Sequence, residues 1–205
     1  MSHQHLMATL PFMLCSSRGQ RLRHRAGIFF YNGLTGYVAD VAAKILISAC
    51  LLGQRVRYDG DSKQLSHPLL QRWLDEDRLL PLCPEVSGGL PVPRPAAEIT
   101  APSAADVLAH RGQVQTAAAG DVSRYFLNGA QHALSLCRQH HIRLAILKDH
   151  SPSCGSTQVH DGHFSGTLIP GTGITTTLLQ QHGIRVFNEH QLADAAACLD
   201  GGNTH

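Results

Sequence analysis

Three cysteines, Cys50, Cys83 and Cys154, each come shortly after an apolar segment that has the composition of a buried β-strand. Each also borders a stretch rich in Gly, Pro or Ser, and binding and catalytic residues concentrate in such loops. In open α/β sheets, ligands bind at the carboxyl ends of the parallel strands. If the three segments pair as parallel neighbours, the thiols converge at one edge of the sheet although they are remote in the chain. The three apolar segments are residues 44–49, 79–82 and 144–147.

Several chemistries use thiols in such positions. Each cysteine could be an ordinary buried residue, because Cys is among the most buried residue types. A structural zinc site usually takes four ligands from paired local motifs, and the sequence has no CxxC. Thiolates also hold iron–sulfur clusters, and three of them on a 4Fe-4S cube leave one iron free as a Lewis acid for a soft donor such as sulfur. A single nucleophilic cysteine is the last alternative, with Cys154 before a possible helix start and His150 and His160 nearby in sequence.

The remaining cysteines and the composition restrict the class of protein. Six cysteines without a CxxC motif favour free thiols or metal ligands over a disulfide framework, and Cys137 falls on the apolar face of an expected helix. The formal charge of +2 is small for a nucleic-acid-binding domain, so we expect no long nucleic acid as a partner. The sequence contains no apolar run of membrane-spanning length and no secretory signal, so we expect a cytoplasmic protein without a membrane partner.

Strand and helix patterns alternate along residues 44–205. Leu70, Trp73 and Leu74 recur at helical spacing, which predicts a helix over residues 67–77 between the first two strands. The alternation predicts one α/β domain, a three-layer sandwich on a mostly parallel, Rossmann-like sheet. The other expected elements are helices over residues 121–141, 175–182 and 189–199 and a strand over residues 185–188.

Two segments of this domain have weaker patterns. Residues 86–98 contain three prolines and two glycines, which predicts a loop without regular elements, with Arg94 and Glu98 as its charged members. Residues 104–116 predict at most a short irregular or strand segment near their end. Asp121 is a suitable N-cap for the helix that follows.

Residues 1–43 differ from the rest of the chain. They mix Ser, Gly, Arg and His with scattered apolar residues and show no sustained period, so we expect a poorly ordered N-terminal extension without chemistry. Two interpretations fit this segment. It is either a mobile extension, or a translation of upstream codons from a misplaced start site, with the natural chain beginning near Val41.

Three blocks of sequence resemble one known family. KILISACLLG with VRYDG, LCPEVSGGLPVPRPAAEI, and LAILKDHSPSCGS with FSGTLIPG, in this order, are similar to the thiouracil desulfidases, long catalogued as a domain of unknown function. The resemblance covers residues 44–189. It implies a non-redox 4Fe-4S enzyme that removes sulfur from thiolated pyrimidines by hydrolysis, giving the oxygenated base and hydrogen sulfide.

The resemblance also implies roles for particular residues. Cys50, Cys83 and Cys154 would ligate the cluster, and one iron would have no protein ligand. Glu85, two residues after a ligand, would serve the water or a proton relay, and Ser151 would hold the substrate or relay a proton. The structural alternatives are that Glu85 only caps a loop and that Ser151 only supports a turn.

The expected substrates are 2-thiouracil, 4-thiouracil or 4-thiouridine monophosphate, the last linking the enzyme to salvage of tRNA nucleotides. Backbone N–H groups of residues 153–156 could bind an anion. A non-catalytic iron–sulfur or nucleotide-binding sensor module is the alternative function, and we expect a monomer or a weak homodimer. The candidate substrate or phosphate contacts are Ser48, Asp59, Lys148, Ser153 and Ser156.

Overall fold

The computed structural model of the protein describes residues 28–31, 34–37 and 43–201. Contacts divide the chain into two units, Met1–Val41 and Ala42–His205, and each is described by itself. In the first unit, β1 (Ile28–Tyr31) and β2 (Leu34–Tyr37) pair antiparallel, which the sequence pattern did not indicate. The rest of the predicted poorly ordered extension lies outside the described residues. A domain boundary after residue 43 therefore stays a prediction.

The second unit is built on a sheet of four parallel strands in the order β10-β7-β3-β4. The two central strands, β3 and β7, are buried along their whole length, as apolar runs in parallel sheets are. Edge strand β4 contains Pro81, which an edge position tolerates because one side of the strand has no ladder partner. The strands are β3 (Ile45–Ser48), β4 (Leu79–Leu82), β7 (Leu144–Leu147) and β10 (Arg185–Asn188).

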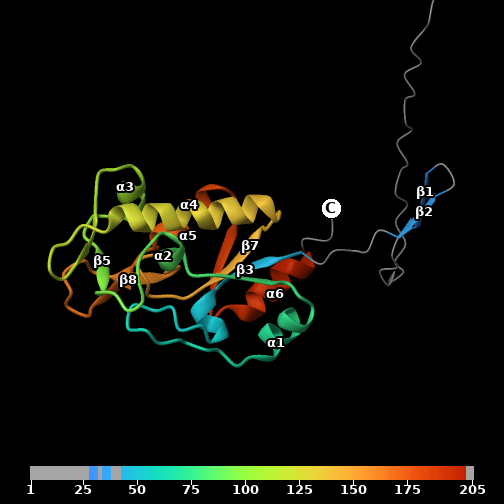
Figure 1. Ribbon diagram of the computed structural model, residues 1–205, viewed down its shortest axis with the longest axis horizontal. Coiled ribbons are helices and arrows are strands. Elements are labelled where there is room, and N and C mark those ends of the chain that lie inside the picture. The colour runs from blue at the N-terminus through green and yellow to red at the C-terminus, as the bar shows by residue number, and fades with distance from the viewer. Residues whose placement is uncertain (1–27, 32–33, 38–42, 202–205) are drawn as a thin grey trace, which may run out of the picture. The chain divides into compact units, whose positions relative to one another are not determined.

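Helices cover both faces of this sheet, because successive side chains of each buried strand point to opposite sides. Leu46 and Ala145 pack into one core cluster with α4 and α5, and Ile47 and Ile146 pack into the other with α1 and α6. Figure 1 shows α4 and α1 on opposite sides of β3 and β7. The predicted three-layer α/β sandwich is confirmed. The helices are α1 (Pro68–Asp75), α4 (Ser123–Gln139), α5 (Ile174–Gln181) and α6 (Leu192–Gly201).

Cys137 is 1% exposed on the buried face of α4, so its predicted position on the apolar face of a helix is confirmed. Among the described residues, no helix combines the length and the apolar composition needed to cross a lipid bilayer.

The possible strand near the end of residues 104–116 is confirmed, but the sequence pattern missed or misplaced the other short elements. The predicted loop over residues 86–98 has a short helix at its start and a short strand at its end, so the prediction of no regular elements is wrong there. The strand is stabilised by antiparallel pairing with β6. Asp121 is not the N-cap, since α4 begins at Ser123 and Val122 precedes it as the N-cap; the Asp121 carboxylate accepts the Ser123 N–H at 2.9 Å. The short elements are α2 (Pro84–Ser87), β5 (Ala97–Ile99), α3 (Ala104–Leu108), β6 (Val114–Thr116), β8 (Gln158–His160) and β9 (Leu168–Pro170).

Helix α2 follows Cys83 directly and lies against α4 at two glycines. A Cβ on Gly129 would stand 2.0 Å from the Pro84 carbonyl oxygen, and a Cβ on Gly88 would stand 2.0 Å from the Tyr125 carbonyl oxygen. No side chain larger than the hydrogen atom of glycine fits between the two backbones. The position of the segment that carries Cys83 and Glu85 therefore depends on this close approach.

We expect Gly129→Ala to lower the free energy of unfolding by about 1–3 kcal/mol, because the added methyl group overpacks the α2–α4 contact. In an open helical position the same change would stabilise the helix by roughly 1 kcal/mol. Urea unfolding followed by circular dichroism measures the difference. Ser135→Ala, at an exposed position of α4, is the matched control and should leave stability within about 0.5 kcal/mol of the wild type. An unchanged or more stable Gly129 variant would contradict the close packing.

Candidate functional site

The three thiols singled out in the sequence lie at the carboxyl edge of the sheet. Cys50 is in the 3-10 helix η1 (Ala49–Leu52) that follows β3, Cys83 is the N-cap of α2 after β4, and Cys154 is in the loop after β7. All three line one cavity of about 600 Å³. The parallel strands β4, β3 and β7 are neighbours in the sheet, so their ends bring the thiols together.

Burial keeps these thiols protonated in the absence of a cation. It raises the pKa of Cys50 to about 11, an effect that the neighbouring Cys83 increases and that Arg57 and Lys148 oppose. Burial also raises the pKa of Cys83 and of Cys154. At Cys154 a hydrogen bond from Ser48 opposes this shift, and the neighbouring Cys83, Glu85 and Cys50 increase it. A lone catalytic thiolate needs the opposite shift. The raised pKa values therefore disfavour the nucleophilic-cysteine hypothesis.

The arrangement of the three thiols indicates which kind of metal group they could bind. Among the described residues, no three His, Cys, Asp or Glu side chains lie close enough together to bind one metal ion. This disfavours a mononuclear zinc site, whose ligands converge on a single point. In an iron–sulfur cube each cysteine binds a different iron, so its ligands surround the cluster at wider spacing. Three thiols that line one cavity, two of them buried and that of Cys83 partly buried, are a donor set that such a cluster fits.

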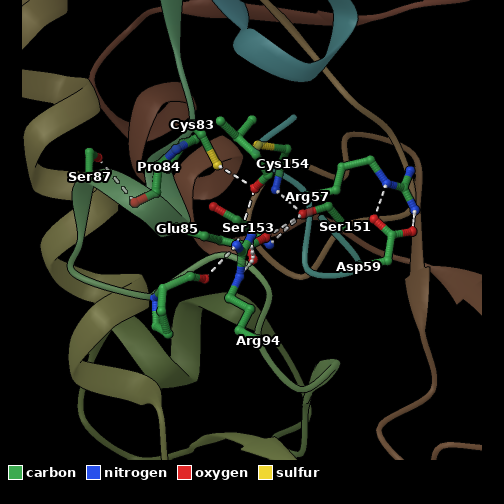
Figure 2. A network of polar contacts seen from close by, with 12 residues as sticks. Arg57, Asp59, Cys83, Pro84, Glu85, Ser87, Arg94, Ser151, Ser153 and Cys154 are labelled. Carbon is green, nitrogen blue, oxygen red and sulfur yellow. Dashed lines mark hydrogen bonds and ion pairs between the residues drawn. The ribbon is translucent and has the colours of Figure 1, made fainter. Parts of the chain in front are cut away.

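Glu85 is held in a polar network next to Cys83 and Cys154 (Figure 2). The Arg94 guanidinium donates from Nε and Nη2 to Oε2 of Glu85 at 2.9 and 2.6 Å. The Arg94 side chain is only 4% exposed, and its Nη1 donates to the carbonyls of Val56 and Pro91. This saturated arginine fixes one carboxylate oxygen of Glu85. The other oxygen, Oε1, accepts a hydrogen bond from the Ser151 hydroxyl at 3.2 Å.

Ser151 links Glu85 to the loop that carries Cys154. Its hydroxyl oxygen accepts the backbone N–H groups of Ser153 and Cys154, each at 3.1 Å, while its proton points to Glu85. Pro152 biases the residue before it away from helical backbone, which suits this turn. The hydroxyl thus has a structural role and also offers a proton path to the carboxylate.

The backbone N–H groups of residues 153–156 do not form an anion site. The first two donate to Ser151, that of Gly155 donates to the Ser151 carbonyl at 2.8 Å, and that of Ser156 donates to Asp149 at 2.8 Å. All four donors are used within the loop. The predicted anion nest is therefore wrong, because the loop satisfies its own backbone.

Asp149 organises the other side of the same loop. Its carboxylate accepts hydrogen bonds from the backbone of Ser156 and Thr157, the Thr157 hydroxyl and the Asn188 amide. Burial alone would raise the pKa of Asp149, but these hydrogen bonds outweigh it and lower the pKa to about 2. The carboxylate is 3% exposed and stays ionised. It ties the loop after β7 to the end of β10.

Two of the five predicted substrate contacts line the cavity, namely Ser48 and Lys148. The Ser48 hydroxyl donates to Cys154 Sγ at 3.5 Å and accepts the Lys148 backbone N–H at 3.0 Å. The Lys148 ammonium forms an ion pair with Glu189. Ser48 therefore positions a thiol, and Lys148 has its structural partner while still facing the cavity.

The other three predicted contacts are not among the lining residues of the cavity. The Asp59 carboxylate pairs with Arg57, and its pKa is lowered by hydrogen bonds from Arg57 and Asp61 that outweigh burial. The Ser153 hydroxyl lies 2.9 Å from the Thr175 hydroxyl, and the Ser156 hydroxyl accepts the Asn188 amide. Their assignment to substrate stays a prediction that this placement does not support.

Some lining residues were missed as site residues. Arg57 lies beside Asp59 in the VRYDG block, and only the fold shows that the arginine faces the cavity. Glu98 was noted as a charged loop member but not placed at the site, and His160 was noted only as close in sequence to Cys154. In the sequence, the only signal for Glu98 was a charged residue at the end of a Pro-rich segment. Its burial, which is rare for an unpaired Glu, is visible only in the structure.

The fold and cavity define a Rossmann-like α/β protein with a thiol-lined ligand site at the carboxyl edge of its sheet. A family model described as 2-thiouracil desulfurase matches residues 45–191, and the chain belongs to that family. It is 38% identical over 150 residues to the uncharacterised protein YbbK of Bacillus subtilis strain 168, covering 73% of this chain and 98% of YbbK. It is also similar to the solved structure of the 4Fe-4S-dependent thiouracil desulfidase TudS, with a TM-score of 0.72 and 47% identity over 77% of this chain and 98% of TudS.

We expect Asp149→Asn to reduce the free energy of unfolding at pH 7 by about 2 kcal/mol. The folded-state pKa of about 2 lies below the ordinary value of 3.8, so the carboxylate stabilises the fold above about pH 4. This contribution is lost as the pH falls through about 2. Urea unfolding at pH 7 and at pH 3 should show the difference between variant and wild type shrinking in acid. Asp75→Asn, at an exposed position of α1, should show no such dependence, and a pH-independent difference for Asp149→Asn would contradict the linkage.

Proposed function

We propose that this protein is an iron–sulfur-dependent desulfidase that hydrolyses thiolated pyrimidines to the oxygenated base and hydrogen sulfide. The observation that carries the proposal is the meeting of Cys50, Cys83 and Cys154 on one cavity beside the Glu85–Ser151 pair. The 4Fe-4S dependence and thiouracil desulfidase activity of TudS support it. Water supplies the oxygen and the two protons that leave with sulfur, so the reaction needs no electron donor or acceptor.

Cys50, Cys83 and Cys154 would hold the cluster as thiolates, which leaves one iron without a protein ligand. When bound, the cluster supplies a Lewis acid that prefers the thiocarbonyl sulfur, since both are soft. Arg57 and Lys148 lower the pKa of Cys50 and so favour its thiolate. Ser48 donates to Cys154 Sγ and would keep that ligand in place.

Glu85 is the residue that we assign to proton transfer. Arg94 occupies Oε2 with two hydrogen bonds, so Oε1 is the oxygen that faces Ser151 and can take the proton of an attacking water. Ser151 would hold Oε1 in this direction, because its hydroxyl donates to Oε1 while its two lone pairs accept the N–H groups of Ser153 and Cys154. The proton that Glu85 takes from water would then return to the departing sulfur. General acid–base help of this kind accelerates a reaction roughly 100- to 10,000-fold.

The cavity has the size of a small-molecule site, since such sites span roughly 300–1,000 Å³. Leu90 and Phe126 offer apolar surface to a base, while Arg57 and Lys63 line the cavity as cations. A thiolated base or its monophosphate fits this combination, with 2-thiouracil, 4-thiouracil and 4-thiouridine monophosphate as the proposed substrates. We also propose that the enzyme takes part in the salvage of tRNA nucleotides, of which 4-thiouridine monophosphate is one.

Five cysteines in the described part of the chain are free thiols, which suits the reducing cytoplasm that we propose as its location. We propose a monomer or weak homodimer that acts on small molecules and not on long nucleic acids.

Anaerobic reconstitution with iron and sulfide should give the wild-type protein a visible absorbance shoulder. Adding 4-thiouridine monophosphate should then remove the thiocarbonyl absorbance and release sulfide. Cys154→Ser should bind little or no cluster, because one of three ligands is lost, whereas Cys198→Ser should assemble it normally. A cluster without turnover would favour a sensor module. Absence of any cluster in the wild type would exclude the proposed enzyme.

We expect Glu85→Gln to retain the cluster and to lower kcat roughly 100- to 10,000-fold, because the amide cannot take a proton. The amide oxygen can still accept from Arg94, so the fold and the iron content should match the wild type. Iron and sulfide content, thermal unfolding and single-turnover sulfide release measure these properties together. Full activity in this variant would remove Glu85 from the mechanism.

A further inference from the structure

Glu98 and His160 are two residues of the cavity wall that the mechanism above does not use. Glu98 is 7% exposed, and its Oε2 accepts the backbone N–H of Phe164 at 3.0 Å. Its Oε1 accepts no hydrogen bond from the residues that the structure describes. His160 Nδ1 is buried and likewise has no hydrogen-bond partner among them. The two atoms are 4.0 Å apart, which is too far for a hydrogen bond.

Backbone contacts hold this pair in place. Glu98 is the central residue of β5, which pairs with β6, and His160 ends β8, which pairs with β9. The turn after β8 passes close to β5 at Gly162, whose φ is +81° and whose Cβ would stand 2.5 Å from the Ile99 carbonyl oxygen. Only glycine fits there without strain or clash. The two polar side chains therefore face the cavity from rigid and separately anchored segments.

A buried polar atom without a partner is uncommon in folded proteins, and each instance asks for an explanation. Here His160 Nδ1 is such an atom, whereas Glu98 Oε1 is not fully buried and makes no hydrogen bond within the described residues. The two atoms also differ in kind. The Glu98 carboxylate can only accept hydrogen bonds when ionised, and a neutral His160 can donate from Nδ1. A ligand that offers a donor beside an acceptor would satisfy both atoms together.

We propose, on the basis of the proposed function, that Glu98 and His160 recognise the base of the substrate through one edge of its ring. In a uracil ring, N3–H lies between the carbons at positions 2 and 4. When one of these carbons bears the reacting sulfur, N3–H and the remaining carbonyl oxygen still lie side by side. Glu98 Oε1 accepts from N3–H, and His160 Nδ1–H donates to that carbonyl.

This arrangement determines specificity. The pair accepts uracil-type rings thiolated at position 2 or at position 4, because N3–H is common to both. It rejects cytosine-type rings, whose N3 is an acceptor and would face the carboxylate, with an amino group opposite the histidine donor. A site built for a hydrogen bond discriminates strongly against a ring that cannot make it, because its buried groups are then left unpaired.

The test is equilibrium binding of uracil, 3-methyluracil and cytosine to the cluster-reconstituted full chain, followed by ligand-detected NMR. The wild type should bind uracil at least about 10-fold more tightly than either of the other two. Glu98→Gln should lower the affinity for uracil about 10- to 100-fold. Its affinity for cytosine should equal or exceed that of the wild type, because the new amide can donate to N3. His160→Asn should also reduce the preference. Glu76→Gln, a carboxylate at the C-cap of α1, is the matched control and should leave all three affinities unchanged.

Two results would overturn the inference. One is an unchanged ratio of uracil to cytosine affinity in Glu98→Gln, and the other is an equal loss for all three ligands, which would mean that the pair only supports the cavity wall. Sulfide release is measured separately on the same preparations. If the wild type prefers uracil through Glu98 but releases no sulfide, base recognition is supported and the proposed desulfidase activity is contradicted. If the wild type releases sulfide but Glu98→Gln leaves the preference for uracil unchanged, the desulfidase activity is supported and base recognition by Glu98 is contradicted.

Discussion

The parallel pairing of β3 with both β4 and β7 is the constraint on which the site depends. Parallel strands end at the same edge of a sheet, so residues that follow them meet even when they are remote in the chain. Register makes this meeting close: Ile47 is opposite both Pro81 of β4 and Ile146 of β7. The chain then leaves the three strands through η1, α2 and the loop at Cys154. A shift of one residue in either pairing would move a thiol away from the cavity.

The site combines groups that are costly to bury, and each cost has an identifiable compensation. The three thiols avoid charge while they keep their protons, since burial raises their pKa values. Glu85 and Asp149 remain compatible with burial through hydrogen bonds, from Arg94 in the first case and from the 156–157 backbone in the second. Glu98 and His160 differ from these groups because each has a polar atom that makes no hydrogen bond within the part of the chain that the structure describes. That difference is what assigns them to a ligand.

Ser48 and Lys148 illustrate how one residue serves both the fold and the site. The Ser48 hydroxyl receives the Lys148 backbone N–H and passes a hydrogen bond to Cys154, so it connects β3, β7 and a thiol. Lys148 pairs with Glu189 beyond β10, yet it still influences the Cys50 thiol. Side chains of this kind make the cavity a rigid continuation of the sheet. Rigidity at this edge suits a site that must hold a large cofactor and a small base together.

The sequence by itself determined the three-layer α/β architecture, because buried strands and amphipathic helices carry periodic patterns that local residues express. It also indicated the three thiols with Glu85 and Ser151, since they lie in motifs contiguous in the chain. The tertiary structure alone decided which polar side chains face the cavity. Asp59, Ser153 and Ser156 found partners elsewhere, and Arg57, Glu98 and His160 took places on the wall. The direction of a loop side chain depends on contacts between distant segments, such as Gly162 against Ile99, and no local pattern records them.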